Sequence, residues 1–388
     1  TQKCLIAECW CPTSDLDKIQ LALKRGTEES GSTVPSILNR MDTDEMPPTY
    51  HRVNKFTRGF QNIVDSYGIA TYREVNPAPY TIITFPFLFA VMFGDTGHGV
   101  IMLAAGLFFV LKEKALEAKR INDEIFQTFF GGRYVILLMG CFSIYTGLIY
   151  NDFYSKSVNI FGSSWRNPYT EIQLDGLEED VKLILPPEYA FQDDGPYPFG
   201  VDPVWNLAEN KLNFLNSMKM KSSIILGICQ MTFGVVLSLM NYRYFKSTVD
   251  ILTMFIPQML FLGCIFIYLC LQVIMKWLFF STKAEYIFGR YYPGSHCAPS
   301  LLIGLINMFM MKSREAGFVS KVPVNGSEPV PGDEFQQCYL TQWYPGQSFF
   351  EGLFVLVAIC CIPFMLFAKP YLLHKEHRLR RLNGGANL

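Results

Sequence analysis

An aspartate and a histidine lie inside one of the longest apolar stretches of this sequence. The stretch reads FPFLFAVMFGDTGHGVIMLAAGLFFVL and contains Asp95 and His98. A charge that faces hydrocarbon costs about a few kcal/mol. Asp95 is therefore expected either to cap the helix that follows it or to line a water-filled cavity, where a carboxylate can exchange protons. His98 titrates near neutral pH and could assist this exchange, although a histidine at a membrane interface is more often a hydrogen-bonded anchor.

Three glycines, Gly94, Gly97 and Gly99, surround this pair of residues. They predict a tight hairpin or a re-entrant pair of helices, because a sharp turn between helices requires positive φ angles and a close approach of the backbones.

A second polar pair ends the third apolar stretch, in YTGLIYNDFYSK. Asn151 and Asp152 are expected on the same side of the membrane as Asp95. Two carboxylates at the ends of separate spans predict a hydrophilic vestibule that carries protons. The alternative is that Asp152 is a solvated loop residue.

The sequence contains no Walker loop, no zinc-binding spacing and no nucleophile elbow, so no catalytic residue, metal ion or cofactor is predicted. Among the eleven cysteines, Cys297 and Cys338 share one long polar loop. They are predicted to form a disulfide if that loop faces an oxidising compartment.

Half of the residues are hydrophobic and only 17% are charged, with a formal net charge of −1. No basic field therefore favours nucleic acid as a partner. Six apolar stretches approach the roughly 20 residues that cross a bilayer as a helix: 79–95, 98–112, 134–151, 223–241, 252–279 and 349–368. The predicted fold class is mainly α, a polytopic helical membrane domain over residues 77–368. Residues 1–76, with a short strand in KCLIAECW, are predicted to be the end of an α+β cytoplasmic domain and its connector.

The orientation in the bilayer follows from lysine and arginine, which concentrate on the cytoplasmic side. The segments 112–133, 242–250 and 368–388 carry such lysines and arginines and are predicted to be cytoplasmic, the last as a basic linker. Residues 1–76 are predicted to lie on the same side. The long loops 152–222 and 281–348 then face the lumen or the exterior. The sequon at Asn325 lies in the second of these loops and agrees with this assignment.

Three long stretches resemble one known family. PPTYHRVNKFTRGFQNIVDSYGIATYREVNPAPYTIITFPFLFAVMFGDTGHG, GRYVILLMGCFSIYTGLIYNDFYSKSVNIFGSSW and GPYPFGVDPVWNLAENKLNFLNSMKMKSSIILG are similar to subunit a of the eukaryotic vacuolar-type proton ATPase. The similarity covers nearly the whole chain. The chain opens without a methionine or an apolar leader, and it is expected to be a piece of a longer protein that lacks most of the N-terminal domain and the last two spans.

The resemblance implies a stator subunit with eight spans that supplies two proton half-channels beside a rotating proteolipid ring. By this resemblance, Asp95 and Asp152 would belong to the luminal half-channel. The implied partners are the proteolipid ring, other membrane-sector subunits, and the peripheral stalks and ATP-hydrolysing sector, which the N-terminal domain contacts. The implied location is the membrane of acidic organelles (vacuole, lysosome, endosome or Golgi) or the plasma membrane.

Two other functions remain open from the residues alone. A secondary transporter would use GDTGHG as a broken-helix substrate site, but such carriers usually show a matching interruption in a second half. A membrane scaffold without a transport role would leave Asp95 and Asp152 replaceable.

Overall fold

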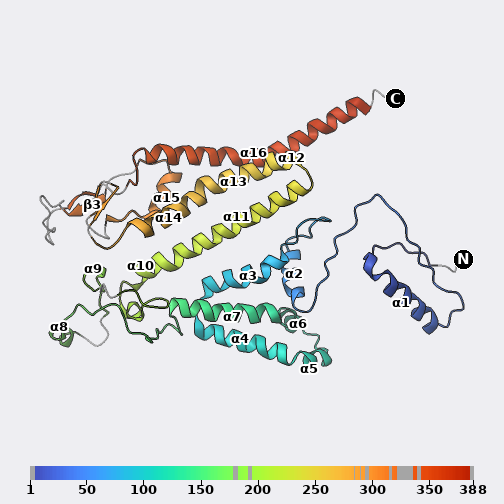
Figure 1. Cartoon of the computed structure of the whole chain (residues 1–388), viewed down its shortest axis with the longest axis horizontal. Coiled ribbons are helices and arrows are strands. Elements are labelled where there is room, and N and C mark those ends of the chain that lie inside the picture. The colour runs from blue at the N-terminus through green and yellow to red at the C-terminus, as the bar shows by residue number, and fades with distance from the viewer. Residues whose placement is uncertain are drawn as a thin grey trace. The chain divides into compact units, whose positions relative to one another are not determined.

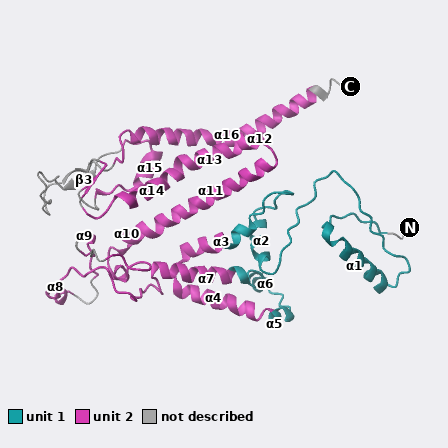
Figure 2. Ribbon diagram, viewed as in Figure 1, with its two compact units in different colours: residues 1–83, 114–135 teal, residues 84–113, 136–388 magenta. Residues whose placement is uncertain are grey.

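The computed structural model describes residues 5–177, 182–190, 195–283, 285–288, 290–292, 297–313, 317–320, 335–338 and 342–384. The chain divides into two compact units (Figure 2). Unit 1 comprises residues 1–83 and 114–135, and unit 2 comprises residues 84–113 and 136–388. The helices dominate both units (Figure 1), which confirms the predicted mainly α fold.

The α-helices that lie wholly or almost wholly in the described part of unit 1 are α1 (Leu16–Glu29), α2 (Thr57–Asp65), α5 (Glu113–Ala118, whose first residue belongs to unit 2) and α6 (Glu124–Gly131). The strand predicted in KCLIAECW does not form over residues 5–10. A strand needs a neighbour for its backbone hydrogen bonds, and none of the described residues of unit 1 is in a strand.

A hydrogen-bonded network holds the connector that precedes the first apolar helix. Gln61, on α2, is buried and donates through Nε2 to Asp65 Oδ1 over 2.9 Å. Its Oε1 accepts from Asn76 Nδ2 over 2.8 Å, and Asn76 Oδ1 accepts from Ala78 N over 3.2 Å. This network fixes α2 to the residues where the apolar helix begins.

In the described part of the chain, four helices are long and apolar enough to cross a membrane: Arg133–Tyr150, Lys211–Tyr244, Thr248–Phe279 and Gln347–Leu382. Two shorter apolar helices, α3 (Ala78–Phe93) and α4 (Thr96–Leu111), precede them. Each of the six predicted apolar stretches is therefore helical. At about 1.5 Å per residue, α3 and α4 are each about 24 Å long, somewhat short of the ~30 Å hydrocarbon core.

The helices α4 and α7 (Arg133–Tyr150) pack against each other through glycines. A Cβ at Gly99 would lie 2.9 Å from Ile144 N, one at Gly106 2.9 Å from Leu137 N, and one at Gly140 2.6 Å from Leu103 N. A Cβ at Gly147 would overlap the backbone nitrogen of Thr96. The contact positions descend along α7 as they ascend along α4, so the two helices are antiparallel and their backbones touch.

The helix α3 runs parallel to α7 in unit 2. Tyr150 OH donates to Val91 O over 2.9 Å, and the rings of Phe87 and Phe142 meet edge to face at 6.0 Å. Since α4 is antiparallel to α7, α3 and α4 form the predicted hairpin. Its glycines act differently from the prediction: none of Gly94, Gly97 and Gly99 has a positive φ. They allow close approach instead, because a Cβ would meet the Tyr150 ring, the Tyr154 ring and the Ile144 backbone respectively.

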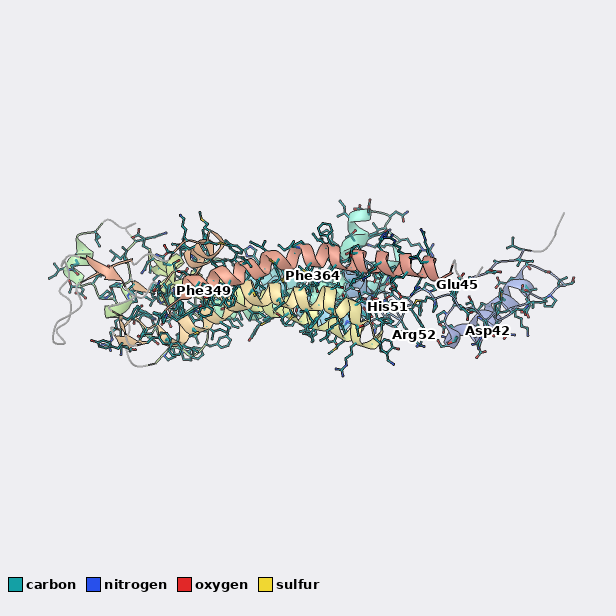
Figure 3. All side chains as sticks on the ribbon, turned by 90° about the horizontal axis from the view of Figure 1, so that it is seen from above. Asp42, Glu45, His51, Arg52, Phe349 and Phe364 are labelled. Carbon is teal, nitrogen blue, oxygen red and sulfur yellow. The ribbon has the colours of Figure 1, made fainter. Side chains whose placement is uncertain are left out.

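The remaining apolar helices form a second group in unit 2. Lys211–Tyr244 consists of α10 (Lys211–Leu215), a π-helical turn and α11 (Lys221–Tyr244). Thr248–Phe279 consists of α12 (Thr248–Asp250), α13 (Ile256–Leu262) and α14 (Tyr268–Phe279), joined by two π-helical turns. The last is α16 (Gln347–Gly384), which packs on α13 and α15 (Leu301–Phe309). Along α16, Phe349 and Phe364 (Figure 3) are 72% and 50% exposed, as expected of side chains that face lipid.

Two boundaries differ from the sequence prediction. The helix of the fourth apolar stretch begins at Lys211 rather than near residue 223, and that of the sixth continues to Gly384 rather than ending near residue 368. Both extensions are polar or basic, and lysine, arginine and leucine are good helix formers whether or not they face lipid.

The long polar loops carry short elements. They include α8 (Glu171–Asp175), α9 (Pro187–Ala190) and two antiparallel pairs: β1 (Glu285–Ile287) with β2 (Arg290–Tyr292), and β3 (Gly317–Ser320) with β4 (Phe335–Cys338). Trp205 is the buried centre of the first loop, where it stacks on Phe214 at 4.0 Å and meets Trp165 edge to face.

Cys297 is buried and disulfide-bonded, beside Ile287 and Tyr292. The side chain of Cys338 lies outside the described residues, so its pairing with Cys297 stays a prediction. Peptide mapping of the unreduced full-length protein is expected to recover Cys297 joined to Cys338. Recovery of Cys297 joined to any other cysteine, or as a free thiol, would contradict this assignment.

Candidate functional site

Asp95 caps the N-terminus of α4. Its backbone is extended (φ −137°, ψ 121°), and its Oδ1 accepts hydrogen bonds from Gly97 N over 2.9 Å and from Tyr154 N over 3.2 Å. The side chain is only 18% exposed. The capping role predicted as one of two alternatives is therefore present, and it anchors the chain after α7 as well as α4.

His98 is the direct partner of Asp95. Its Nδ1 lies 2.5 Å from Asp95 Oδ2, one helical turn along α4. The ring also meets Tyr154 edge to face at 5.0 Å and Phe93 at 6.0 Å. The histidine is thus held at the helix end by an acceptor and two aromatic rings.

Asp152 lies next to Asp95 through the backbone. Thr96 N donates to Asp152 O over 3.1 Å, and Asp152 N donates to Gly147 O over 3.0 Å. The Asp152 carboxylate accepts from Ser155 N over 3.0 Å and lies 4.0 Å from Lys219 Nζ, with the side chain 32% exposed. The structure therefore brings both predicted carboxylates to one end of the α4–α7 pair.

Asn151 holds the loops at this end. Its φ of +49° is a left-handed conformation that asparagine tolerates better than most residues. Its Nδ2 donates to Val158 O and Val201 O, and its Oδ1 accepts from Val158 N, all within 3.1 Å. These bonds engage both the oxygen and the nitrogen of the Asn151 side chain, which also lines the pocket described below. Its place on a proton path stays a prediction.

Lys219 is a member of the site that the sequence prediction missed. It projects from the π-helical turn before α11, and its Nζ lies 4.6 Å from the centre of the Tyr150 ring. No local motif marks it, because its contacts come from α7 and the following loop, about 70 residues earlier in the sequence.

A pocket of about 200 Å³ opens beside Asp152. Its polar lining includes Asp152, Asp202, Lys211, Lys219 and Asn206. A space of this size with these polar groups on its lining has room for several water molecules. Asp95 is not among the residues that line it; the next residue, Thr96, donates its backbone N–H to Asp152 O.

Of the other predicted positions, Cys297 belongs to the second long loop, and Asn325 lies outside the described residues. Among the described residues, no group of three or more histidine, cysteine, aspartate or glutamate side chains is placed to hold a metal ion.

A buried carboxyl group lies elsewhere in unit 2, at Glu351 on α16. The side chain is 3% exposed, and its Oε1 accepts from Tyr268 OH over 3.0 Å and from Gln347 Nε2 over 2.9 Å. Gln347 Oε1 in turn accepts from Trp343 N over 2.8 Å. These bonds join α14, α16 and the segment before α16. The sequence prediction missed Glu351 because it falls inside a stretch that is otherwise apolar.

Replacing Glu351 with glutamine is expected to leave the free energy of unfolding within about 1 kcal/mol of wild type, because glutamine keeps an oxygen for both donors. Glu351→Leu leaves the hydroxyl of Tyr268 and the amide of Gln347 without this acceptor and is expected to cost about 1–3 kcal/mol. Thermal unfolding of the full-length subunit in detergent measures both. Equal losses for the two variants would show that charge, rather than hydrogen bonding, is what the position requires.

Known proteins are similar to this chain over nearly its whole length. A family described as "V-type ATPase 116kDa subunit family" matches residues 1–387. The V-type proton ATPase 116 kDa subunit a 1 of Caenorhabditis elegans is 66% identical over 384 residues, which cover 97% of this chain and 41% of the relative. Subunit a 3 of the same organism is 63% identical over 394 residues (97% and 45%), and subunit a 1 of Mus musculus is 50% identical over 391 residues (100% and 43%). The chain spans less than half the length of these relatives.

Proposed function

Because the chain belongs to the V-type ATPase 116 kDa subunit family, we propose that it forms part of the membrane sector of a rotary, proton-translocating ATPase. The match over residues 1–387 is the observation that carries this proposal. The apolar helices described above supply the membrane-embedded part of such a subunit.

Asp95 and Asp152 contribute to the luminal proton half-channel in this proposal. Asp152 lines a pocket large enough for water, together with other charged and polar side chains, and the residue after Asp95, Thr96, is hydrogen-bonded to Asp152 O. A proton that leaves a carboxylate of the neighbouring proteolipid ring needs hydrated acceptors on its way to the lumen, and ionised aspartates provide them.

The proposed partners are the proteolipid ring and other membrane-sector subunits. The N-terminal domain would connect the chain, as a stator, to the peripheral stalks and to the subunits that hydrolyse ATP. The chain itself would contribute no catalytic group. Its place would be the membrane of an acidic organelle or the plasma membrane, with the N-terminal domain in the cytoplasm.

Affinity purification of the full-length protein from detergent-solubilised membranes tests the proposal directly. Proteolipid and nucleotide-binding subunits are expected to co-purify in fixed proportion. Purification of the protein without them, with uptake of a small solute after reconstitution, would favour a secondary transporter instead. The hairpin of α3 and α4 gives that alternative little support, because the two helices run antiparallel rather than as two halves of one broken membrane span.

The orientation gives a separate prediction. Asn325 is expected to carry a glycan that a glycosidase removes, and Asn325→Gln is expected to abolish the resulting mobility shift, because lysine and arginine place this loop on the luminal side. Protease added to the cytoplasmic side of sealed vesicles should spare residues 281–348. Cleavage there from the cytoplasmic side would reverse the topology.

A further inference from the structure

The last helix is longer than a membrane is thick. With 38 residues, α16 extends about 57 Å at 1.5 Å per residue, against about 30 Å of hydrocarbon. Residues 352–368 contain no charge, and Lys369 is the first basic residue after them. The 16 residues from Lys369 to Gly384 therefore extend about 24 Å beyond the apolar part of the helix.

An ion pair marks where α16 leaves the apolar layer. Lys369 Nζ lies 2.6 Å from Asp250 Oδ1, at the beginning of the Thr248–Phe279 helix. Arg243, in the last turn of α11, and Lys246, in the short turn between α11 and this helix, are both exposed. The end of α11, the start of the Thr248–Phe279 helix and the point where α16 leaves the apolar layer thus lie close together. The acidic side chain there, Asp250, is already paired with Lys369.

The end of α16 is basic along one ridge. Residues 369–384 contain five lysines and arginines and one glutamate, a formal charge of +4. Lys375, Arg378 and Arg381 recur every three residues and are exposed, so they share one side of the helix. Glu376 is engaged by Arg380, which lies 2.6 Å away, and does not neutralise that ridge.

Apolar side chains adjoin the ridge. Tyr371, Leu372, Leu379 and Leu382 are all exposed, and their spacing places them on one face of the helix, which overlaps the basic ridge at Lys375. Pro363 and Pro370 lie inside α16, and proline bends a helix. Figure 1 shows the C-terminal part of α16 turning away from the direction of its first part. A basic helix with an adjoining apolar face is typical of segments that lie along a bilayer surface.

We propose that Lys375, Arg378 and Arg381, together with Arg243 and Lys246, form a binding site for anionic phospholipid headgroups of the leaflet into which these helix ends emerge. This group of five residues is called the basic rim. Clusters of lysine and arginine next to a membrane helix attract anionic lipids by about 1 kcal/mol per residue near the surface. The apolar face beside the ridge contacts the acyl-chain boundary, and the tyrosine lies at headgroup depth.

Photocrosslinking of the intact complex in lipid nanodiscs tests the basic rim. A photoactivatable phosphatidylserine is expected to label the tryptic peptides of residues 369–384 more than the matching phosphatidylcholine probe does. Arg378→Gln should lower the phosphatidylserine labelling about fivefold. Arg380→Gln is the matched control: it removes the same side chain two residues away, where Glu376 already offsets the charge, and should change labelling by less than about twofold.

Four results would overturn the proposal. Three are equal labelling by the two probes, no effect of Arg378→Gln, and full competition by soluble glycerophosphoserine, which would assign the rim to free anions. Loss of another subunit from the Arg378→Gln complex, without loss of lipid labelling, would assign the rim to a protein partner and would also reject it.

Discussion

Alanine in place of Gly147 is expected to prevent the stable packing of α4 against α7. The new Cβ would overlap Thr96 N and lie 2.7 Å from the carbonyl carbon of Asp95. These are backbone atoms that cannot rotate away, so the helices must separate. Overpacking of this kind costs about 1–3 kcal/mol or more, and most of the folded full-length subunit is expected to be lost.

The chain provides a matched control and a graded comparison. Gly234 lies in α11, where a Cβ would meet nothing within 4 Å. Gly234→Ala is expected to be neutral or to stabilise by up to about 1 kcal/mol through higher helix propensity. Gly106→Ala, with a Cβ 2.9 Å from Leu137 N, should be intermediate. Thermal stability and the yield of monodisperse protein in detergent measure the series. A Gly147→Ala variant as stable as Gly234→Ala would mean that α4 and α7 do not touch through Gly147.

The membrane helices could be predicted from the sequence because apolar composition and length determine them. The starts of α3, α4 and α7 lie within two residues of the predicted stretches. The ends of the longer helices were less predictable, since Lys211–Met220 and Lys369–Gly384 are polar and hydropathy cannot distinguish a polar helix from a loop.

The sequence contains an indication of the packing of α4 against α7 that the prediction did not use. Gly99 and Gly106, and likewise Gly140 and Gly147, are spaced by seven residues, which places each pair on one face of its helix. Small residues at such spacing favour close helix contact in membranes. The contacts of Lys219 had no comparable signal, because they depend on how distant segments meet.

Two expectations were attached to Asp95: the helix cap is confirmed, and the role in proton exchange stays a prediction. The helix cap could be predicted from an aspartate directly before a helix. The neighbourhood of Asp152 could be expected from the two apolar stretches ending on one side. The pocket beside Asp152 depends on Lys211, Asn206 and Asp202, which come from a polar loop whose path no periodicity reveals.

Replacing Asp95 or Asp152 with asparagine removes the charge and is expected to slow proton transport by the full complex about tenfold. This corresponds to an increase of about 1.4 kcal/mol in the free-energy barrier of transport. Asparagine keeps an acceptor for Gly97 N at position 95 and for Ser155 N at position 152. Assembly should therefore remain near wild type in both Asp→Asn variants. Acidification of reconstituted vesicles, normalised to assembled complex, measures the effect.

Asp123→Asn provides the control for the capping role. Asp123 caps α6 through Ile125 N, away from the site in sequence and in the other unit, and asparagine caps equally well. Its transport should be unchanged. This comparison separates helix capping from proton transfer at Asp95. If Asp95 acts only as a cap, Asp95→Asn should leave transport unchanged, as Asp123→Asn does.

The relative size of the two effects tests the shared path. Asp152 lines the pocket and Asp95 does not, so a proton that follows water in the pocket can reach Asp152 without contacting Asp95. If both carboxylates relay the proton in series, each single variant slows transport and the double variant adds little, because one broken step already limits the rate. If Asp152 alone contacts the path, only Asp152→Asn slows transport, and Asp95 is a cap held by His98. Wild-type rates in both single variants would remove the two aspartates from the path altogether.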